Sequence, residues 1–457
     1  MPNCGCNDYS RTQLLRRAAA EAGQGLPAIE PGMPLPAGTG LTRRSFVSRA
    51  TGLALSVYGA ASLGPRAFEH GIAAAAAQAP ASDPILVSIF LSGGADALTL
   101  LAQTSAHPQY AQWRPTLALP AGQGTALAED PTLRFHPSLA GVAELYGEGK
   151  VSVMPAIGYD DANQSHFTSR HYWEVGEVNP WGRWGWLGRY LDHHGVADNP
   201  LQGLTLGWDL QPSLAAHDVP VATVAQPDNY DFWTPGVWGP VQDKMLDAFS
   251  DLGDPPTGDA GLAQARSAVA ATGRLRDQLA PYQGGFTTPA GVTYPNGDFA
   301  GRLRALAAMI DGGLPLKVVA IESGGYDTHS NQLATLPPDL QEVGDSLRAF
   351  QRDLEASGLA DRVLVHVWSE FGRRAEENGS NGTDHGAAGT GFLLGTRASG
   401  RMVGEFPGLA KLDEDGNLRA TSDFRGLYAA ILEDWLGADA GAILPRARSF
   451  RRPTILK

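Results

Sequence analysis

Four segments of the chain place acidic residues, histidines or a serine just beyond apolar runs. These segments are Gly93-Gly94-Ala95-Asp96, Ser165-His166, Asp327-Thr328-His329 and Asp384-His385. Carboxylate oxygens and imidazole nitrogens together are ligands that suit Zn, Mn or Fe ions. Asp327 and His329 are two residues apart and can reach one ion. Asp384 and His385 are adjacent, so in an extended segment they point to opposite sides and serve different ions or an outer shell of contacts.

Asp96 and Ser165 each have two interpretations. Asp96 is a candidate metal ligand, but an acid after two glycines also suits a turn or a helix cap. Ser165 precedes a helical pattern, where the helix dipole favours an anionic oxygen and a nearby cation would make its hydroxyl a nucleophile. Alternatively, Ser165 only caps that helix. Two ions, if both are present, would clamp the attacking and leaving oxygens of an ester.

A third group of candidates lies further along the chain and in a tryptophan-rich stretch. Arg373 follows a strand pattern and would steady an anionic group of a substrate, or pair with Glu370 or Glu376. Several tryptophans fall close together and would either stack on a sugar ring or pack in the core. They are Trp173, Trp181, Trp184 and Trp186.

Short apolar runs that alternate with helical patterns predict the elements that position these residues. The predicted strands span residues 85–91, 151–155, 317–321, 362–368 and 392–394. The predicted helices span residues 137–148, 164–175, 260–279, 299–310, 340–356 and 423–436. This alternation predicts a doubly wound α/β fold with a mostly parallel sheet between helices. Ligands bind beyond the carboxyl ends of such strands, which is where the candidate residues fall.

The domain organisation follows from the same patterns. Residues 83–457 are expected to form a single α/β domain. Residues 178–258 are rich in Trp, Pro, Gly and Asp and have little periodicity. They are expected to form an irregular insertion over one end of the sheet.

The N-terminal segment has the pattern of an export signal. Arg43 and Arg44 precede Phe46 and a short apolar run of small residues, which is typical of a twin-arginine signal peptide. An alanine-rich segment predicts cleavage after Ala77 or Ala79. Residues 1–79 are therefore expected to be a disordered leader and signal, with the twin-arginine translocase as a partner during export. The mature protein is expected outside the cytoplasmic membrane, without a stable membrane span.

Composition excludes several classes of protein. The chain has 457 residues and 43% hydrophobic residues, so it is not a disordered polyelectrolyte, and its net charge of −13 disfavours sequence-independent nucleic-acid binding. Its two cysteines are Cys4 and Cys6, which excludes a disulfide framework in the folded domain.

The order of these motifs resembles the exported bacterial "domain of unknown function 1501" family. The shared motifs are the twin-arginine leader, Gly93-Gly94-Ala95-Asp96, Ser165-His166-Phe167, Gly325-Tyr326-Asp327-Thr328-His329, Ser369-Glu370-Phe371-Gly372-Arg373 and Thr383-Asp384-His385-Gly386. That family is similar in fold to the alkaline phosphatase and sulfatase superfamily. The resemblance implies that Asp96, Asp384 and His385 hold one metal ion, that Asp327 and His329 hold another, and that Ser165 is the nucleophile.

Two functions are carried forward. The first is an exported metal-dependent hydrolase of phosphate or sulfate esters, with Ser165 or a metal-bound water as nucleophile, Arg373 beside the anion, and a small anionic ester as substrate. The second is a non-catalytic exported binding or assembly protein that keeps a degenerate site. No histidine follows His385, although the superfamily has a late histidine ligand, and this favours the second function.

Overall fold

The structure is a computed structural model that describes residues 15–16, 19, 32–38, 83–196, 199–229, 237–253 and 255–457. The twin-arginine motif and the predicted cleavage sites lie outside these residues, so export stays a prediction. Among the described residues, no helix combines the length and the apolar character needed to cross a membrane.

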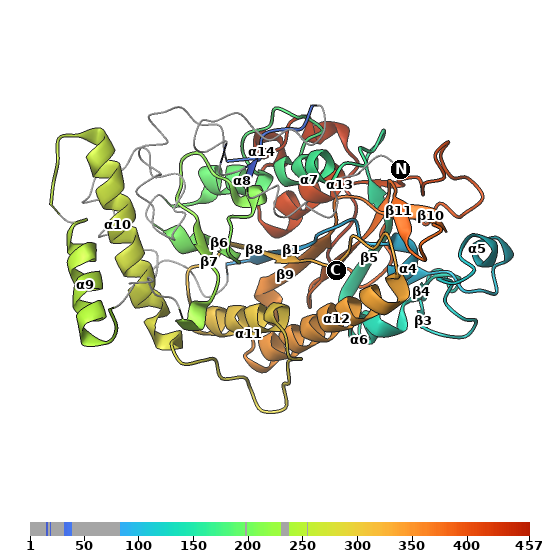
Figure 1. The fold of residues 1–457 in the computed structure, drawn as a ribbon, viewed down its shortest axis with the longest axis horizontal. Coiled ribbons are helices and arrows are strands. Elements are labelled where there is room, and N and C mark those ends of the chain that lie inside the picture. Colours follow the sequence, from blue (N-terminus) through green and yellow to red (C-terminus); the bar gives the residue numbers. More distant parts are fainter. Residues whose placement is uncertain are drawn as a thin grey trace.

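An eight-stranded sheet forms the centre of the molecule (Figure 1). Its order is β13-β5-β12-β9-β1-β8-β6-β7. The bounds are β1 Ile85–Leu91, β5 Val151–Gly158, β6 Gly203–Leu206, β7 Ala222–Val224, β8 Val318–Ser323, β9 Val363–Trp368, β12 Gly389–Leu394 and β13 Ser422–Asp423. Only β12 pairs in antiparallel fashion, with β5 and β9. The predicted mostly parallel α/β sheet is therefore confirmed.

Helices cover both faces of this sheet (Figure 1). One layer contains α6 Ala140–Gly147, α11 Asp298–Asp311 and α12 Gln332–Ala356. The other contains α7 His166–Val175, α8 Trp186–His194, α13 Phe424–Ala430 and α14 Ala440–Ile443. Successive side chains of a strand point to opposite faces. Accordingly, Ile85, Val87 and Ile89 of β1 join the first core, whereas Leu86 and Phe90 join the second.

The remaining elements lie around the sheet. A pair of helices, α9 Pro240–Asp251 and α10 Ala260–Leu279, projects on the left of Figure 1. Two short helices, α4 Ala97–Leu100 and α5 Pro108–Trp113, follow β1, and a small sheet joins β2 Leu101–Ala102, β4 Arg134–Phe135 and β3 Thr125–Ala126. A hairpin of β10 Arg373–Glu377 and β11 Thr383–His385 follows β9.

The structure adds detail to the expected insertion and to the leader. Residues 178–258 are not simply irregular, because they supply β6 and β7, which extend the main sheet beyond β8. In the described part of the leader, Ala37 is fully buried in the second core and Gly38 donates its amide to the Arg183 carbonyl at 2.7 Å. Small side chains allow this close approach.

The tryptophan cluster divides between core and surface. Trp173 and Trp186 are 2% and 1% exposed and stack on the rings of Phe424 and Tyr428, respectively. Trp181 is 83% exposed. The core interpretation therefore holds for the two tryptophans that are buried.

Candidate metal centre

The carboxyl ends of neighbouring strands bring the candidate residues to one edge of the sheet. Asp327 and His329 lie on the loop after β8, His166 is the first residue of α7, and His385 ends β11. In the hairpin, Arg373 pairs with His385 across the two strands. Segments that are far apart in the sequence therefore meet at one place, as predicted for ligands beyond parallel strands.

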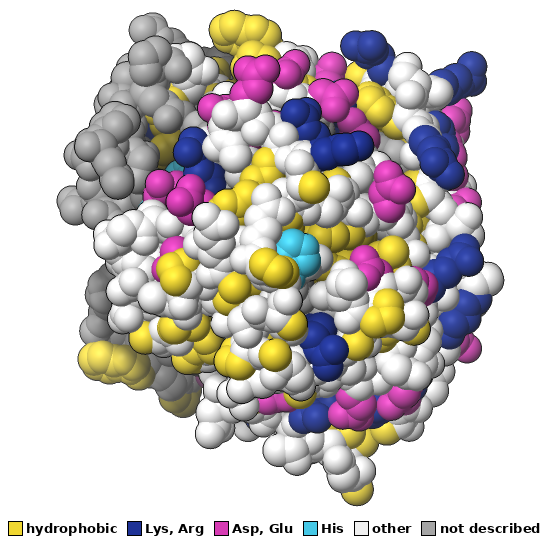
Figure 2. Space-filling view, turned by 90° about the vertical axis from the view of Figure 1, so that its right-hand side faces the viewer, with side chains coloured by type: hydrophobic (Ala, Val, Ile, Leu, Met, Phe, Trp, Pro, Cys, Tyr) yellow, Lys and Arg dark blue, Asp and Glu magenta, His cyan; other side chains and the backbone are white. Residues whose placement is uncertain are grey.

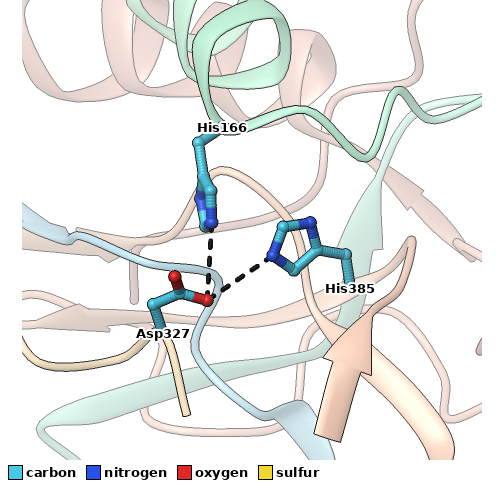
Figure 3. A group of neighbouring side chains, drawn as sticks. All are labelled: His166, Asp327 and His385. Carbon is cyan, nitrogen blue, oxygen red and sulfur yellow. Dashed lines mark ion pairs between the residues drawn. The ribbon is translucent and has the colours of Figure 1, made fainter. Parts of the chain in front are cut away.

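Three imidazoles surround one carboxylate oxygen at this edge. Figure 3 shows two of them, those of His166 and His385, directed at Asp327. The Oδ1 atom of Asp327 lies 3.1 Å from the Nε2 atom of His329 and 3.5 Å from the Nε2 atoms of His166 and His385. The Nε2 atoms of His329 and His385 are 2.9 Å apart. Among the described residues, one nitrogen or oxygen atom each of His166, Asp327 and His385 lies within 4.8 Å of the other two, which is close enough for a shared metal ion.

The second nitrogen of each imidazole faces an acceptor. The Nδ1 atom of His166 lies 2.8 Å from Glu370 Oε1, that of His385 lies 2.8 Å from the Gln164 carbonyl, and that of His329 lies 3.2 Å from Asp384 Oδ1. A hydrogen on Nδ1 satisfies all three contacts and leaves the Nε2 lone pairs directed at the cluster. This is how metal-binding histidines are held in proteins.

Glu370 is completely buried and joins His166 to the first strand. Its carboxylate accepts hydrogen bonds from the amides of Gly93 and Gly94, at 3.0 and 2.9 Å. Burial opposes its ionisation, but the contacts with His166 outweigh burial and lower its pKa. Gly93 is required here, because a Cβ atom would lie 2.4 Å from the Asp327 amide and its φ is +123°.

An aromatic ring closes one side of the cluster. The Phe371 ring lies 4.9 Å from the His166 ring and 4.8 Å from the His385 ring, measured between centroids. Burial lowers the pKa of His385 to about 4, against the opposing effect of Asp327, so this imidazole is neutral at physiological pH. A neutral imidazole is the form that binds a metal.

Asp327 is ionised. Burial opposes its ionisation, but the contacts with the three imidazoles and the charge of Arg373 hold its pKa well below the usual range. The side chains of Asp327 and His329 remain 24% and 30% exposed, so the cluster is open to solvent. Figure 2 views the molecule from the hairpin side and shows a histidine at the surface, near the middle of a mostly uncharged area.

The structure gives Arg373 other partners than those expected. Its completely buried guanidinium donates to the carbonyls of Gly94, Thr383, Gly93 and Tyr326, and to Asp327 Oδ1 at 2.6 Å. These contacts engage its donors within the protein, which disfavours a direct contact with a substrate anion. Arg373 instead positions Asp327.

Asp96 does not join the cluster. Both of its oxygens bind the buried guanidinium of Arg114, at 2.5 and 2.9 Å, and Gln332 Nε2 donates to it at 2.7 Å. The same carboxylate caps α4 by accepting from the Leu98 amide. The predicted metal ligand is therefore a helix cap within a buried ion pair.

Asp384 and Ser165 lie beside the cluster. The Asp384 carboxylate accepts from Asn378 Nδ2 at 3.0 Å and contacts the Nδ1 atom of His329, so it orients that imidazole instead of pointing at the centre. Ser165 is the N-cap of α7, and its hydroxyl oxygen accepts from the Thr168 amide at 3.3 Å. The capping interpretation of Ser165 is thus confirmed, and its role as a nucleophile stays a prediction.

The sequence prediction missed His166 as a candidate ligand and Glu370 as the residue that holds it. His166 belongs to the Ser165-His166 motif, in which only the serine was assigned a function. Glu370 was considered only as a partner of nearby Arg373, whereas its partner His166 lies 204 positions away in the chain. A pair so distant in sequence leaves no local signal.

The fold and the site define an α/β protein with a histidine- and carboxylate-rich centre at the carboxyl edge of its sheet. Residues 289–434, which include Asp327, His329 and His385, match the family described as "Protein of unknown function (DUF1501)". This match confirms the resemblance found in the sequence. A search of curated proteins found no match.

Three solved structures share part of the fold. The lipoteichoic acid synthase LtaP from Listeria monocytogenes is 8% identical, with a TM-score of 0.34 over 80% of this chain and 74% of that one. The PsFucS1 sulfatase from Pseudoalteromonas sp. is 11% identical, with a TM-score of 0.34 over 87% and 72%. A TAB5 alkaline phosphatase mutant is 10% identical, with a TM-score of 0.28 over 69% and 91%. These TM-scores are low, so the similarity supports no conclusion about the chemistry of this chain.

Proposed function

We propose that the protein is an exported, metal-dependent hydrolase of phosphate or sulfate esters. The observation that carries the proposal is the convergence of three Nε2 atoms on Asp327 Oδ1, each imidazole being held through its other nitrogen. Nitrogen and oxygen donors of this kind suit Zn, Mn or Fe. A carboxylate has about four lone-pair sites, so Asp327 can accept from Arg373 and still face an ion.

A single ion fits the described residues better than two. His166, His385 and Asp327 would hold it, with His329 as a fourth ligand, whereas Asp96 is engaged by Arg114. Bound there, the ion would supply Lewis acidity toward an ester oxygen. Glu370, Gln164 and Asp384 would keep the imidazoles in place.

The chain itself offers two sources for the attacking oxygen. The Ser165 hydroxyl lies at the N-terminus of α7, directly before His166, where the helix dipole favours negative charge. In this route its oxygen forms the bond to phosphorus or sulfur while the bond to the leaving oxygen breaks, and the serine proton passes to that leaving oxygen. Water then hydrolyses the seryl ester. In the other route, a water molecule attacks directly and Ser165 only caps the helix.

Hydrolysis of p-nitrophenyl phosphate and p-nitrophenyl sulfate tests this function. With Zn, Mn or Fe supplied, the wild type is expected to hydrolyse one of the two esters. The His385→Ala variant is expected to lose at least about 100-fold in kcat/KM. His217→Ala is the matched control, since the His217 side chain is 59% exposed and contacts Asp218. Equal activity of the two variants would reject the site.

A second candidate is a non-catalytic exported binding or assembly protein. It is favoured by Arg373, whose guanidinium lies 2.6 Å from Asp327 Oδ1 and 3.4 Å from His329 Nε2 and brings positive charge to the cluster without an ion. This candidate predicts a folded protein that binds no metal and leaves both esters intact.

Export is proposed from the sequence motif alone. When Arg43 and Arg44 are both changed to Lys, the protein should be lost from the exported fraction. Unchanged export of that double variant would contradict use of the twin-arginine route.

A further inference from the structure

A pocket lies beyond the carboxyl ends of β6 and β7, next along the sheet from the strands that carry the histidine cluster. It encloses about 220 Å³. Trp208 enters from the segment after β6, residues 225–228 follow β7, and the first turns of α11 close the far side. This volume is below the roughly 300–1,000 Å³ of sites for drug-sized ligands, so it suits one small ring.

The lining combines an exposed aromatic face with donors and acceptors. Trp208 is 76% exposed, although large aromatic side chains usually bury most of their surface. Arg302 and Arg304 line the pocket as donors, and Asp228 and Asp298 as acceptors. The Nε atom of Arg304 is buried and has no hydrogen-bond partner among the described residues.

A second pocket continues from the first along α11. It encloses about 290 Å³ and shares Gly297, Gly301 and Arg304 with the first. Its other lining residues carry hydroxyl and amide groups, including Thr288, Thr293 and Asn296. Because they share these lining residues, the two pockets lie side by side at α11, and together they are called the groove.

We propose that this groove binds a saccharide chain, with one sugar ring stacked on Trp208. A sugar ring has an apolar C–H face that packs on an indole, and hydroxyls that both donate and accept hydrogen bonds. The two acids disfavour a simple anion, and the buried Nε atom of Arg304 disfavours an apolar ligand, which would leave that donor without a partner. A neutral or mixed-charge saccharide satisfies both kinds of group.

Hydrogen bonds connect the groove to α7, the helix that begins with His166. Arg302 donates to the Glu322 carbonyl at the end of β8, at 3.1 Å. The Glu322 carboxylate accepts from Arg170 at 3.1 Å, and Arg170 belongs to α7, the helix that begins with His166. A saccharide in the groove would therefore lie along the same sheet edge as the cluster, but its binding does not depend on the proposed hydrolysis.

Glycine at position 301 allows a steric test. A Cβ atom there would meet nothing within 4 Å, and the residue lies in α11 between the two pockets. Gly301→Leu is therefore expected to fill the groove without disturbing the fold, since leucine favours a helix more than glycine does. Gly301→Ala leaves most of the groove open and is the matched control.

The experiment is binding of the folded protein to an array of neutral and acidic oligosaccharides, followed by titration of the best-bound member. We expect Trp208→Ala and Gly301→Leu each to weaken binding by roughly tenfold or more. Trp238→Ala and Gly301→Ala are expected to bind like the wild type, because Trp238 is similarly exposed, at 77%, but lines neither pocket.

Two results would overturn the proposal. One is the absence of any bound oligosaccharide with the wild type. The other is binding that Gly301→Leu and Trp208→Ala leave unchanged. Both readouts are independent of ester hydrolysis, so a failure here is distinguishable from a failure of the metal site.

Discussion

Each clustered imidazole is fixed at both ring nitrogens, and this double contact defines the site more than the histidines alone do. Asp327, His329 and His385 were found in the sequence because they fall in short motifs just beyond strands. Asp96 looked equivalent, but its partner Arg114 lies 18 positions away, beyond another helix. Residue type and spacing predict candidates, while the acceptors that orient them come from distant segments.

The contact between Glu370 and His166 gives a prediction at this scale. Glu370→Gln should weaken metal affinity about 10–100-fold, because the neutral amide holds the Nδ1 hydrogen of His166 less strongly. Competition with a chelator measures this affinity. Glu376→Gln is the control, because Glu376 is exposed and lies in the β10–β11 hairpin that follows Glu370. Equal affinities in the two variants would exclude an orienting role for Glu370.

At the scale of elements, periodicity predicted the long helices and buried strands well. The pattern at residues 260–279 coincides with α10, and that at 362–368 with β9. The short strands β6 and β7 were missed. They have four and three residues, which are too few for an alternating pattern of apolar and polar positions to be recognised. The antiparallel direction of β12 was also unpredictable, since an apolar run carries no direction.

Substitutions of Ser165, at the start of α7, can distinguish helix capping from catalysis. Ser165→Ala should lower stability by about 1 kcal/mol through loss of the cap, and Ser165→Asn should retain it. If Ser165 is the nucleophile, both variants lose ester hydrolysis. Thermal unfolding together with activity measures both effects. Full activity of the Ser165→Asn variant would restrict Ser165 to the cap.

At the scale of the whole molecule, one buried ion pair joins four segments around the site. Arg114, directly after α5, binds Asp96 and donates to the carbonyls of Ala375 and Arg374 in β10. Gln332 at the start of α12 completes the contact with Asp96. The pair therefore holds the hairpin that carries His385 against the sheet.

This pair predicts an acid-dependent loss of stability. Burial opposes the ionisation of Asp96, but Arg114 outweighs it and holds the pKa below its ordinary value of 3.8. The stability that the lowered pKa confers is fully present above pH 3.8 and is lost as pH falls toward the folded-state value.

Asp96→Asn should lower the free energy of unfolding at pH 7 by about 3–5 kcal/mol, because Arg114 stays buried without its partner. The loss should shrink in acid. Denaturant unfolding at about pH 7 and about pH 3 measures it, with Asp361→Asn at an exposed position as control. A loss that is the same at both pH values would contradict this assignment.

The most direct test of the central claim is the metal content of the folded protein, measured by elemental mass spectrometry in the wild type and in His166→Ala. We predict close to one Zn, Mn or Fe ion per chain in the wild type and a large loss in the variant, although the sequence motifs alone did not select His166 as a ligand. A wild type that stays free of metal after reconstitution, or a variant that retains the ion, would contradict the account.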